Sequence, residues 1–358
     1  MKIAVVGVGL IGGSIGMAAR GEVEHAEVIG AGRDRTRLER ALARGAIDSA
    51  ADSIESAVAD AQACFVCGPV GALGDLVAQA LAAAPADCVV TDVGSTKREL
   101  CAAIDDERFV GGHPIAGAET AGVEHARADL FQGATWYLTP AERSSGLLYE
   151  RLHGLLVAFG ARPVAIDPGA HDRLLAAVSH LPHVLANVLV AQAARTRAEQ
   201  GESLPRVGPS FRDATRVAGA NSAIWTDIYL ANREAIATEI DETVRRLEEV
   251  ARSLRAADGP ALTGWNEQAG GDRRRLLEAD LQGGPVHELR LSVPNRPGIV
   301  AQVALELGRG DVNIVDLALA PAADMRSGAM TLWIAGDAAA ARARELIEAL
   351  GFSVSEAS

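Results

Sequence analysis

The sequence is poor in cysteine and almost free of lysine. Its four cysteines are Cys64, Cys67, Cys88 and Cys101. They are too few and too scattered for a disulfide framework. Cys64 and Cys67 form a C-x-x-C pair, but no second pair exists and the run ACFVCGP is apolar, which favours ordinary buried cysteines over a metal or redox site. Lys2 and Lys97 are the only lysines, so arginine carries the remaining basic charge.

Net positive charge and long apolar runs are also missing. The formal net charge is −13, which argues against a surface that binds nucleic acid or another polyanion. We find no run of about 20 uncharged apolar residues, so no membrane span is expected. The opening stretch MKIAVVGVG reads as a strand that ends in glycines and not as a signal peptide, so we expect a cytoplasmic protein.

Strands alternate with helices over residues 1–165. Short apolar runs such as KIAVVGV, AEVIGA, ACFVCGP and CVVTDV each precede a stretch with helical character. This alternation predicts an α/β domain of the Rossmann type, built on a doubly wound parallel sheet. Such sheets bind ligands at the carboxyl ends of their strands.

The pattern changes twice further along the chain. Residues 166–257 have helical periodicity without strand signals, which predicts an all-α domain whose long apolar helices pair with a second copy in a homodimer. Residues 258–285 are rich in glycine and charge, and read as a linker with at most one short helix. Residues 286–358 follow the order β-α-β-β-α-β, which predicts a small ferredoxin-like domain.

The first loop carries a dinucleotide-binding motif. Gly7, Gly9 and Gly12 spell G-x-G-x-x-G between the first strand and the first helix. The first glycine permits the tight turn, the second lets a pyrophosphate approach the backbone, and the third allows close helix packing. We expect the phosphates at the amino end of the helix, which starts near Leu10 and Ile11. A glycine-rich turn without a ligand is the alternative.

The end of the second strand bears on the choice of cofactor. An NAD site usually has an acidic residue here, which holds the ribose 2′-hydroxyl. This sequence has Gly32 at that place, followed by Arg33. A missing carboxylate beside an arginine suits a 2′-phosphate, so the pattern favours NADP and leaves NAD open. Asp34 comes two residues late and reads as a helix cap.

Polar residues follow two later strands at the same edge of the sheet. The stretch TDVGSTK supplies Asp92, Ser95 and Lys97, and in a simpler interpretation Ser95 or Thr96 only caps the next helix. The stretch FVGGHP supplies His113, and its glycines let a substrate come close. Because the nicotinamide is expected at this edge, His113 is the candidate catalytic residue.

The helical domain adds histidines and arginines. The motif SHLPH contains Ser179, His180 and His183 around a proline that should kink its helix. The two histidines share a helix face, but no third ligand accompanies them, so no metal site is predicted. Arg212 and Arg216 in FRDATRVA lie one turn apart and suit binding of carboxylates, with salt bridges inside the fold as the alternative.

Taken in order, five motifs resemble those of a known family. The motifs GVGLIGGS, TDVGSTK, GGHPIAGAETAG, SHLPH and FRDATRVA resemble those of prephenate dehydrogenases of tyrosine biosynthesis. The resemblance covers the sheet domain and the helical domain, and the segment 286–358 looks like an ACT domain, a module that binds small effectors. It implies oxidative decarboxylation of prephenate to 4-hydroxyphenylpyruvate with hydride transfer to NAD or NADP. Arogenate, alone or beside prephenate, is the alternative substrate.

The resemblance also assigns roles to residues. It implies that His113 draws off the proton of the ring hydroxyl as hydride leaves, and that Ser95 positions one of these groups. Arg216 matches a residue that holds a substrate carboxylate, and Glu119 and Arg212 match a pair at the mouth of the site. The helical-domain residues that match substrate-facing positions are Ser179, His180 and His183. Asp92 is expected beside the cofactor, at the end of its strand.

For the ACT-like segment the resemblance implies an amino-acid effector, and tyrosine, the end product of the pathway, is the first candidate. The loop PNRPG leads into a helix whose first amides can receive a carboxylate. The expected contacts are Asn295, Gly298 and Asn313.

Two other interpretations compete with this one. A β-hydroxyacid dehydrogenase of similar plan usually relies on a lysine in the helical domain, and this chain has none there. A non-enzymatic regulator that senses a dinucleotide and an amino acid would leave His113, Ser95 and Arg216 unexplained.

Overall fold

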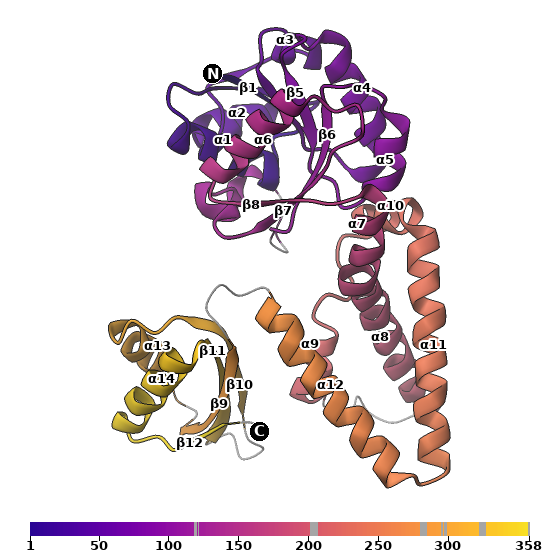
Figure 1. Ribbon diagram of the computed structural model, residues 1–358, viewed down its shortest axis with the longest axis vertical. Coiled ribbons are helices and arrows are strands. Elements are labelled where there is room, and N and C mark those ends of the chain that lie inside the picture. Colours follow the sequence, from indigo (N-terminus) through magenta and orange to yellow (C-terminus); the bar gives the residue numbers. More distant parts are fainter. Residues whose placement is uncertain are drawn as a thin grey trace. The chain divides into compact units, whose positions relative to one another are not determined.

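An eight-stranded sheet forms the centre of the first unit of the structure, Met1–Val244 (Figure 1). This is a computed structural model, and the residues that it describes are 1–117, 120, 122–200, 207–279, 285–294, 296, 299–321 and 327–356. The strand order is β3-β2-β1-β4-β5-β6-β7-β8. The strands are β1 (Lys2–Val6), β2 (Glu27–Ala31), β3 (Ser49–Ala50), β4 (Ala63–Val66), β5 (Val89–Asp92), β6 (Phe109–Pro114), β7 (Thr135–Thr139) and β8 (Arg162–Ala165).

The two faces of this sheet carry separate apolar cores, as a doubly wound fold requires. Along β1, Ile3 and Val5 point into one core, while Ala4 and Val6 point into the other, because successive strand side chains alternate between faces. Helices α1 and α6 pack into the first core, and α3 and α4 into the second. These helices are α1 (Leu10–Glu22), α6 (Gly146–Ala158), α3 (Ile54–Val58) and α4 (Leu73–Ala83).

The sheet is parallel except for one pair of strands. All neighbours from β3 to β6 pair in parallel, as do β7 and β8, whereas β6 and β7 are antiparallel. The described residues of the β6–β7 connection form only the 3₁₀ turns η2 (Val123–His125) and η3 (Ala128–Phe131). A parallel pairing would need a crossover connection, usually a helix, and the described part of this connection contains no α-helix, in keeping with the antiparallel pair. The predicted Rossmann-type sheet is otherwise confirmed.

Helices follow the last strand of the sheet. Asp167 caps the first of them by accepting a hydrogen bond from the Ala170 amide at 2.8 Å. The predicted irregularity around Pro182 takes the form of one π-helical turn immediately before α8, which accommodates the missing proline amide. The segments are α7 (Pro168–Leu175), the π turn η4 (Ala176–His180), α8 (Leu181–Gln200), α9 (Pro209–Ala214), α10 (Ser222–Ala231) and α11 (Arg233–Arg255).

The run from α7 through α8 is unusually apolar. By length and composition alone, Pro168–Arg195 could cross a membrane, and 28% of its most apolar window is buried. Its polar side chains at His171, Asp172 and His180 are nevertheless buried and hydrogen-bonded within the protein. Such groups are costly in a bilayer and belong in a packed helical domain.

The second unit, Arg245–Ser358, contains a small antiparallel sheet with two helices. Its strand order is β10-β11-β9-β12, and α13 and α14 bury their apolar faces against it. This order confirms the predicted ferredoxin-like arrangement. The elements are β9 (Val286–Pro294), α13 (Ile299–Arg309), β10 (Ile314–Pro321), β11 (Ser327–Ala335), α14 (Asp337–Ala349) and β12 (Val354–Glu356).

The interpretation of residues 258–285 as a linker is wrong for most of that segment. Residues Gly259–Ala279 form one long helix, α12. Its glycines cost helix stability, but Asp258 accepts the Ala261 amide at 3.1 Å and caps the first turn. Near its other end, the Arg273 guanidinium lies 5.1 Å from the ring centroid of Trp333, so the helix packs on the small sheet. The division into units also falls inside α11 instead of at residue 257.

Candidate active site

The three motif glycines occupy three different steric situations. Gly7 has φ of +93°, and a Cβ there would lie 2.4 Å from the Cys67 carbonyl oxygen. A Cβ on Gly12 would lie 2.2 Å from the Gly7 carbonyl oxygen, so the helix packs tightly on the loop. A Cβ on Gly9 would meet no described atom within 4 Å. Other protein atoms therefore leave no room for a side chain at Gly7 or Gly12. At Gly9 the space is open, and a ligand can approach the backbone there.

The amino end of α1 faces the same open space. Its N-cap, Gly9, provides no side chain, so the first amides of the helix, at Leu10 and Ile11, have no side-chain acceptor at the cap. The side chains of these two residues pack against the sheet core instead of pointing away from it. The backbone amides and the helix dipole thus offer positive potential to a phosphate.

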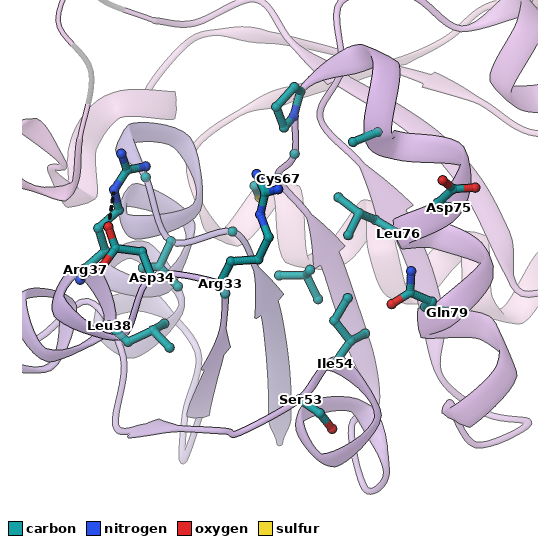
Figure 2. A pocket seen from close by; sticks show the side chains of 18 of the residues that line it. Arg33, Asp34, Arg37, Leu38, Ser53, Ile54, Cys67, Asp75, Leu76 and Gln79 are labelled. Carbon is teal, nitrogen blue, oxygen red and sulfur yellow. Dashed lines mark hydrogen bonds and ion pairs between the residues drawn. The ribbon is translucent and has the colours of Figure 1, made fainter.

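A cavity of about 760 Å³ lies beside this loop (Figure 2). Gly9, Gly32 and Arg33 are among the residues that line it, and Figure 2 shows Arg33 between the Asp34 loop and the helix that carries Leu76. The Asp34 carboxylate accepts the Arg37 amide at 3.2 Å and pairs with the Arg37 side chain, which confirms it as a helix cap of α2 (Arg35–Ala43).

Two cysteines lie on or near the wall of this cavity: Cys67, which is half-buried and lines it, and Cys64, which is fully buried. Burial raises the pKa of Cys64 and of Cys67 far above the usual range, and Cys64 has no exposed surface. Neither thiol is therefore poised to form a thiolate, the form that binds metals and reacts.

A buried ion pair lies between the end of β5 and the start of α5. The Lys97 ammonium contacts an Asp92 carboxylate oxygen, and neither side chain has any exposed surface. The Asp92 carboxylate also accepts the amides of Gly94 at 2.8 Å and Gly112 at 3.1 Å. Its oxygens are thus used inside the protein, where they hold the loop after β5 against the residue that precedes His113.

The alternative that Ser95 or Thr96 caps the next helix is wrong. Helix α5 (Arg98–Ala103) begins after Lys97, and no side chain of its own segment caps it. The Asp172 carboxylate accepts the amides of Lys97 at 2.8 Å and Arg98 at 3.0 Å instead. A residue far along the chain therefore supplies the cap.

His113 at the end of β6 heads a hydrogen-bonded chain of side chains. Its Nδ1 lies 2.9 Å from Nε2 of His171, and Nδ1 of His171 lies 2.8 Å from Oδ1 of Asp172. Both partners come from the start of α7 and are almost completely buried. The sequence analysis missed them. The available signal was a histidine and an aspartate side by side in the first turns of a helix that follows the last sheet strand.

The environment of His113 keeps its imidazole neutral. Burial lowers the pKa of His113 well below its usual value, and the charge of Lys97 and the rings of His171 and His180 act in the same direction. Burial also lowers the pKa of His180 to about 4, against the opposing influence of Asp172. A neutral imidazole can accept a proton at neutral pH.

The two histidines of the SHLPH motif flank one indole ring. His183 stacks on Trp225 with ring centroids 3.5 Å apart, and His180 meets the same ring edge-on at 6.1 Å. The His183 Nδ1 hydrogen-bonds the Tyr229 hydroxyl, while its buried Nε2 has no partner among the described residues. The His180 Nδ1 lies 3.1 Å from the amide nitrogen of Asn232. A second cavity, of about 600 Å³, opens beside His183, Trp225 and Tyr229.

Two family models together cover most of the chain. The nucleotide-binding domain of prephenate dehydrogenase matches residues 15–165, and the dimerization domain of prephenate dehydrogenase matches residues 167–268. The chain belongs to the prephenate dehydrogenase family. The predicted resemblance is thereby confirmed for the sheet and helical domains, whereas neither family model reaches the small sheet of the second unit.

Individual members of the family resemble the chain over most of its length. It is 30% identical to the prephenate dehydrogenase of Bacillus subtilis, over 97% of this chain and 95% of that protein. It is 31% identical to the cyclohexadienyl dehydrogenase of Zymomonas mobilis, over 73% of this chain and 90% of that one.

Solved structures of this family share the fold. Prephenate dehydrogenase from A. aeolicus, in complex with hydroxyphenyl propionate and NAD+, has a TM-score of 0.71 at 27% identity, covering 77% of this chain and 98% of that one. Arogenate dehydrogenase of Synechocystis has a TM-score of 0.67 at 27% identity, covering 77% of this chain and 100% of that one.

The remaining predicted site residues lie in varied surroundings. Ser95 is half-buried between β5 and α5, and Ser179 is half-buried in the π turn. Arg212 is exposed on α9, and Arg216 is exposed in the turn that follows this helix. Asn313 is exposed just before β10. The predicted residues outside the described part of the chain are Glu119, Asn295 and Gly298.

Proposed function

We propose that this protein oxidises prephenate to 4-hydroxyphenylpyruvate, with loss of the ring carboxylate as carbon dioxide. The observation that carries the proposal is the neutral, hydrogen-bonded His113 at the carboxyl edge of a sheet whose first loop suits a dinucleotide. The relatives named prephenate dehydrogenase support the substrate. The bound nicotinamide supplies the hydride acceptor, and formation of the aromatic ring drives the decarboxylation.

Each of the predicted site residues has a proposed role in binding or oxidising the substrate. His113 accepts the proton of the ring hydroxyl as hydride leaves the same carbon, and Ser95 orients the hydroxyl or the imidazole. The guanidinium of Arg216 holds a substrate carboxylate, since arginine binds such groups in a bidentate manner. Arg212 is proposed to act at the entrance of the site together with Glu119, the partner that the family resemblance implies. The histidines of the SHLPH motif and Ser179 face the substrate from the helical domain.

An absorbance assay of the reduced cofactor tests this function directly. The purified full chain is incubated with prephenate or with arogenate, each with NAD and with NADP. We expect reduction of the cofactor and release of carbon dioxide with prephenate. Relatives include a cyclohexadienyl and an arogenate dehydrogenase, so activity with arogenate is the second candidate function. No turnover with either substrate and either cofactor would refute the enzyme assignment.

Cofactor choice depends on Arg33, whose side chain lines the cavity beside Gly32. We propose that it binds the 2′-phosphate of NADP. Replacing Arg33 by alanine should lower kcat/KM for NADP roughly 10- to 150-fold, because a charge-assisted hydrogen bond contributes about 1.5–3 kcal/mol. The value for NAD should change little.

Arg35→Ala is the matched control for that experiment, since Arg35 pairs with Asp52 on the surface and does not line the cavity. It should leave both kcat/KM values near those of the parent protein. A strong NAD preference in the parent that Arg33→Ala does not alter would contradict the role of Arg33.

The small domain is proposed to bind an amino-acid effector, with tyrosine as the first to try. Its ferredoxin-like fold is that of ACT modules, and the helix α13 begins after the predicted binding loop. Tyrosine should change the affinity for prephenate about 5- to 150-fold, the usual range for coupled sites. Calorimetry with tyrosine, and with glycine as a control ligand, measures binding to the full chain.

A substitution at the small domain separates sensing from competition at the active site. Asn313→Ala should weaken tyrosine binding and leave turnover without tyrosine unchanged, because Asn313 is exposed just before β10 in the second unit. Inhibition by tyrosine that persists unchanged in this variant would assign the effect to the active site.

Homodimer formation is proposed for the helical domain. The described helices expose large apolar side chains, and the matched family model is a dimerization domain. Burying these side chains between two copies is favourable in proportion to the apolar area removed from water. They include Val178, Val188, Leu189, Val190, Leu230 and Leu247.

A further inference from the structure

We propose that His171 and Asp172 are positioning residues that fix which nitrogen of His113 carries the proton. In this arrangement His113 holds a proton on Nδ1 and keeps Nε2 free to accept one from the substrate. The inference rests on the proposed role of His113 as proton acceptor, and it adds residues that the motifs of the sequence do not mark.

The chain of hydrogen bonds starts from a carboxylate that can only accept. Burial opposes ionisation of Asp172, but the hydrogen bond from His171 and those from the amides of Arg98 and Lys97 outweigh it and lower the pKa. Backbone amides are obligate donors, so the carboxylate is held in its charged form. The Nδ1 of His171, 2.8 Å from Oδ1, must then carry a proton.

The proton on His171 decides the state of His113. In the proposed arrangement His171 is neutral, and a neutral imidazole with a proton on Nδ1 has a bare Nε2, which can only accept a hydrogen bond. This Nε2 lies 2.9 Å from Nδ1 of His113, so His113 must donate from Nδ1. Its own Nε2 is consequently unprotonated. His113 thus donates to His171, and His171 donates to Asp172. This leaves Nε2 of His113 free to act as a base.

The same series of hydrogen bonds also stabilises His113 after it has accepted the proton. When Nε2 of His113 has taken the hydroxyl proton, the Nδ1 proton continues to bond to His171, and the Asp172 carboxylate lies next in line to offset the charge. Among the described residues, Lys97, which is paired with Asp92, and His180 also act on the charge of His113. They oppose a lasting positive charge on the ring, which favours later release of the proton.

The surrounding packing holds the two positioning residues still. His171 has no exposed surface, and Tyr137 meets its ring edge-on with centroids 5.6 Å apart. Asn232 donates to the backbone carbonyl of Asp172 at 2.7 Å, which ties α7 to the end of α10. The ring of His171 thus has little freedom to turn and reverse its donor and acceptor.

Two substitutions of His171 separate its bond to His113 from its bond to Asp172. His171→Gln places an amide oxygen near the position of Nε2 and can still accept from His113, so kcat should stay within about threefold of the parent value. His171→Asn can bond to Asp172 but is too short to reach His113. It should lower kcat on the order of 10- to 100-fold with little change in KM or in cofactor binding.

Asp172→Asn tests the direction in which hydrogen bonds are donated from His113 through His171 to Asp172. In asparagine, an NH₂ group that donates to His171 takes the place of Oδ1, so the remaining oxygen can accept the Arg98 amide but the Lys97 amide loses its acceptor. In this orientation both tautomers would be reversed and the proton would lie on Nε2 of His113. We expect a loss of kcat on the order of 10²-fold or more, as for other active-site histidines held in the wrong tautomer. His153→Asn, on α6, is the matched control and should keep full activity.

Nitrogen-15 NMR of the histidine rings supplies a readout that does not depend on turnover or on the stability of a variant. In the parent protein His113 should show a proton on Nδ1 and none on Nε2. A proton on Nε2, or equal turnover in His171→Gln and His171→Asn, would overturn the inference. If His113→Asn itself kept normal turnover, the proposed function of His113 would fail instead, so the two failures can be told apart.

Discussion

Replacing His113 by asparagine is expected to lower turnover with prephenate by about 10² or more, the usual contribution of a positioned general base. The asparagine side chain is polar but shorter than histidine, and it cannot take up the hydroxyl proton. Cofactor binding should persist, because the glycine loop and the cavity lie on other elements, and a fluorescence titration with the reduced cofactor measures it. Near-normal turnover in this variant would remove His113 from the mechanism.

The pH dependence of the parent enzyme provides a second measure of the same group. The base form of His113 is the neutral imidazole, and burial, Lys97 and the neighbouring histidines lower its pKa well below the usual value. The active form is therefore present above that lowered pKa and is lost only when the pH falls through it. Turnover should stay level from neutral pH down into the mildly acidic range, whereas a loss that begins near neutral pH would contradict a depressed pKa.

Replacing Lys97 by methionine is expected to lower the free energy of unfolding by about 3–5 kcal/mol, the usual cost of removing one partner from a buried ion pair. The side chains of Lys97 and Asp92 have no exposed surface, so the Asp92 charge would remain without its counter-charge. Chemical denaturation followed by circular dichroism measures the change.

The chain offers an unusually clean control for this substitution. Lys2 is the only other lysine, and it pairs with Asp60 at the surface. Surface ion pairs contribute little, so Lys2→Met should leave the stability almost unchanged. The double variant Asp92→Asn with Lys97→Met removes both charges and should recover much of the loss. Equal stability of Lys97→Met and Lys2→Met would show that the buried pair is not important for the fold.

Local features of this protein were predictable because adjacent residues determine them. A strand, the glycine motif and a helix follow one another within a dozen residues, and the steric demands at Gly7, Gly9 and Gly12 match the predicted roles. The helix cap at Asp34 and the irregular turn before Pro182 are likewise consequences of neighbouring residues. In each case the interaction spans only a few residues, so the order of residue types suffices.

Glycine content misled the prediction for residues 258–285. The four glycines of α12 lower its intrinsic helix propensity, and the sequence alone therefore suggested a linker. The helix is held locally by the cap at Asp258 and by the contact of Arg273 with Trp333, and that contact joins different elements of the second unit. Tertiary packing can outweigh propensity by adding contacts that no local window contains.

The sequence by itself determined the Rossmann-type order of strands and helices, the phosphate-binding loop and the place of His113 at the end of a strand. Only the tertiary structure decided what His113 contacts. His171 lies 58 positions away, and Asp172 reaches the amides of Lys97 and Arg98 across 75 and 74 positions. Such bonds depend on how α7 packs against the sheet edge. The proposed order of donors follows from these long-range contacts, which no pattern of residue types could show.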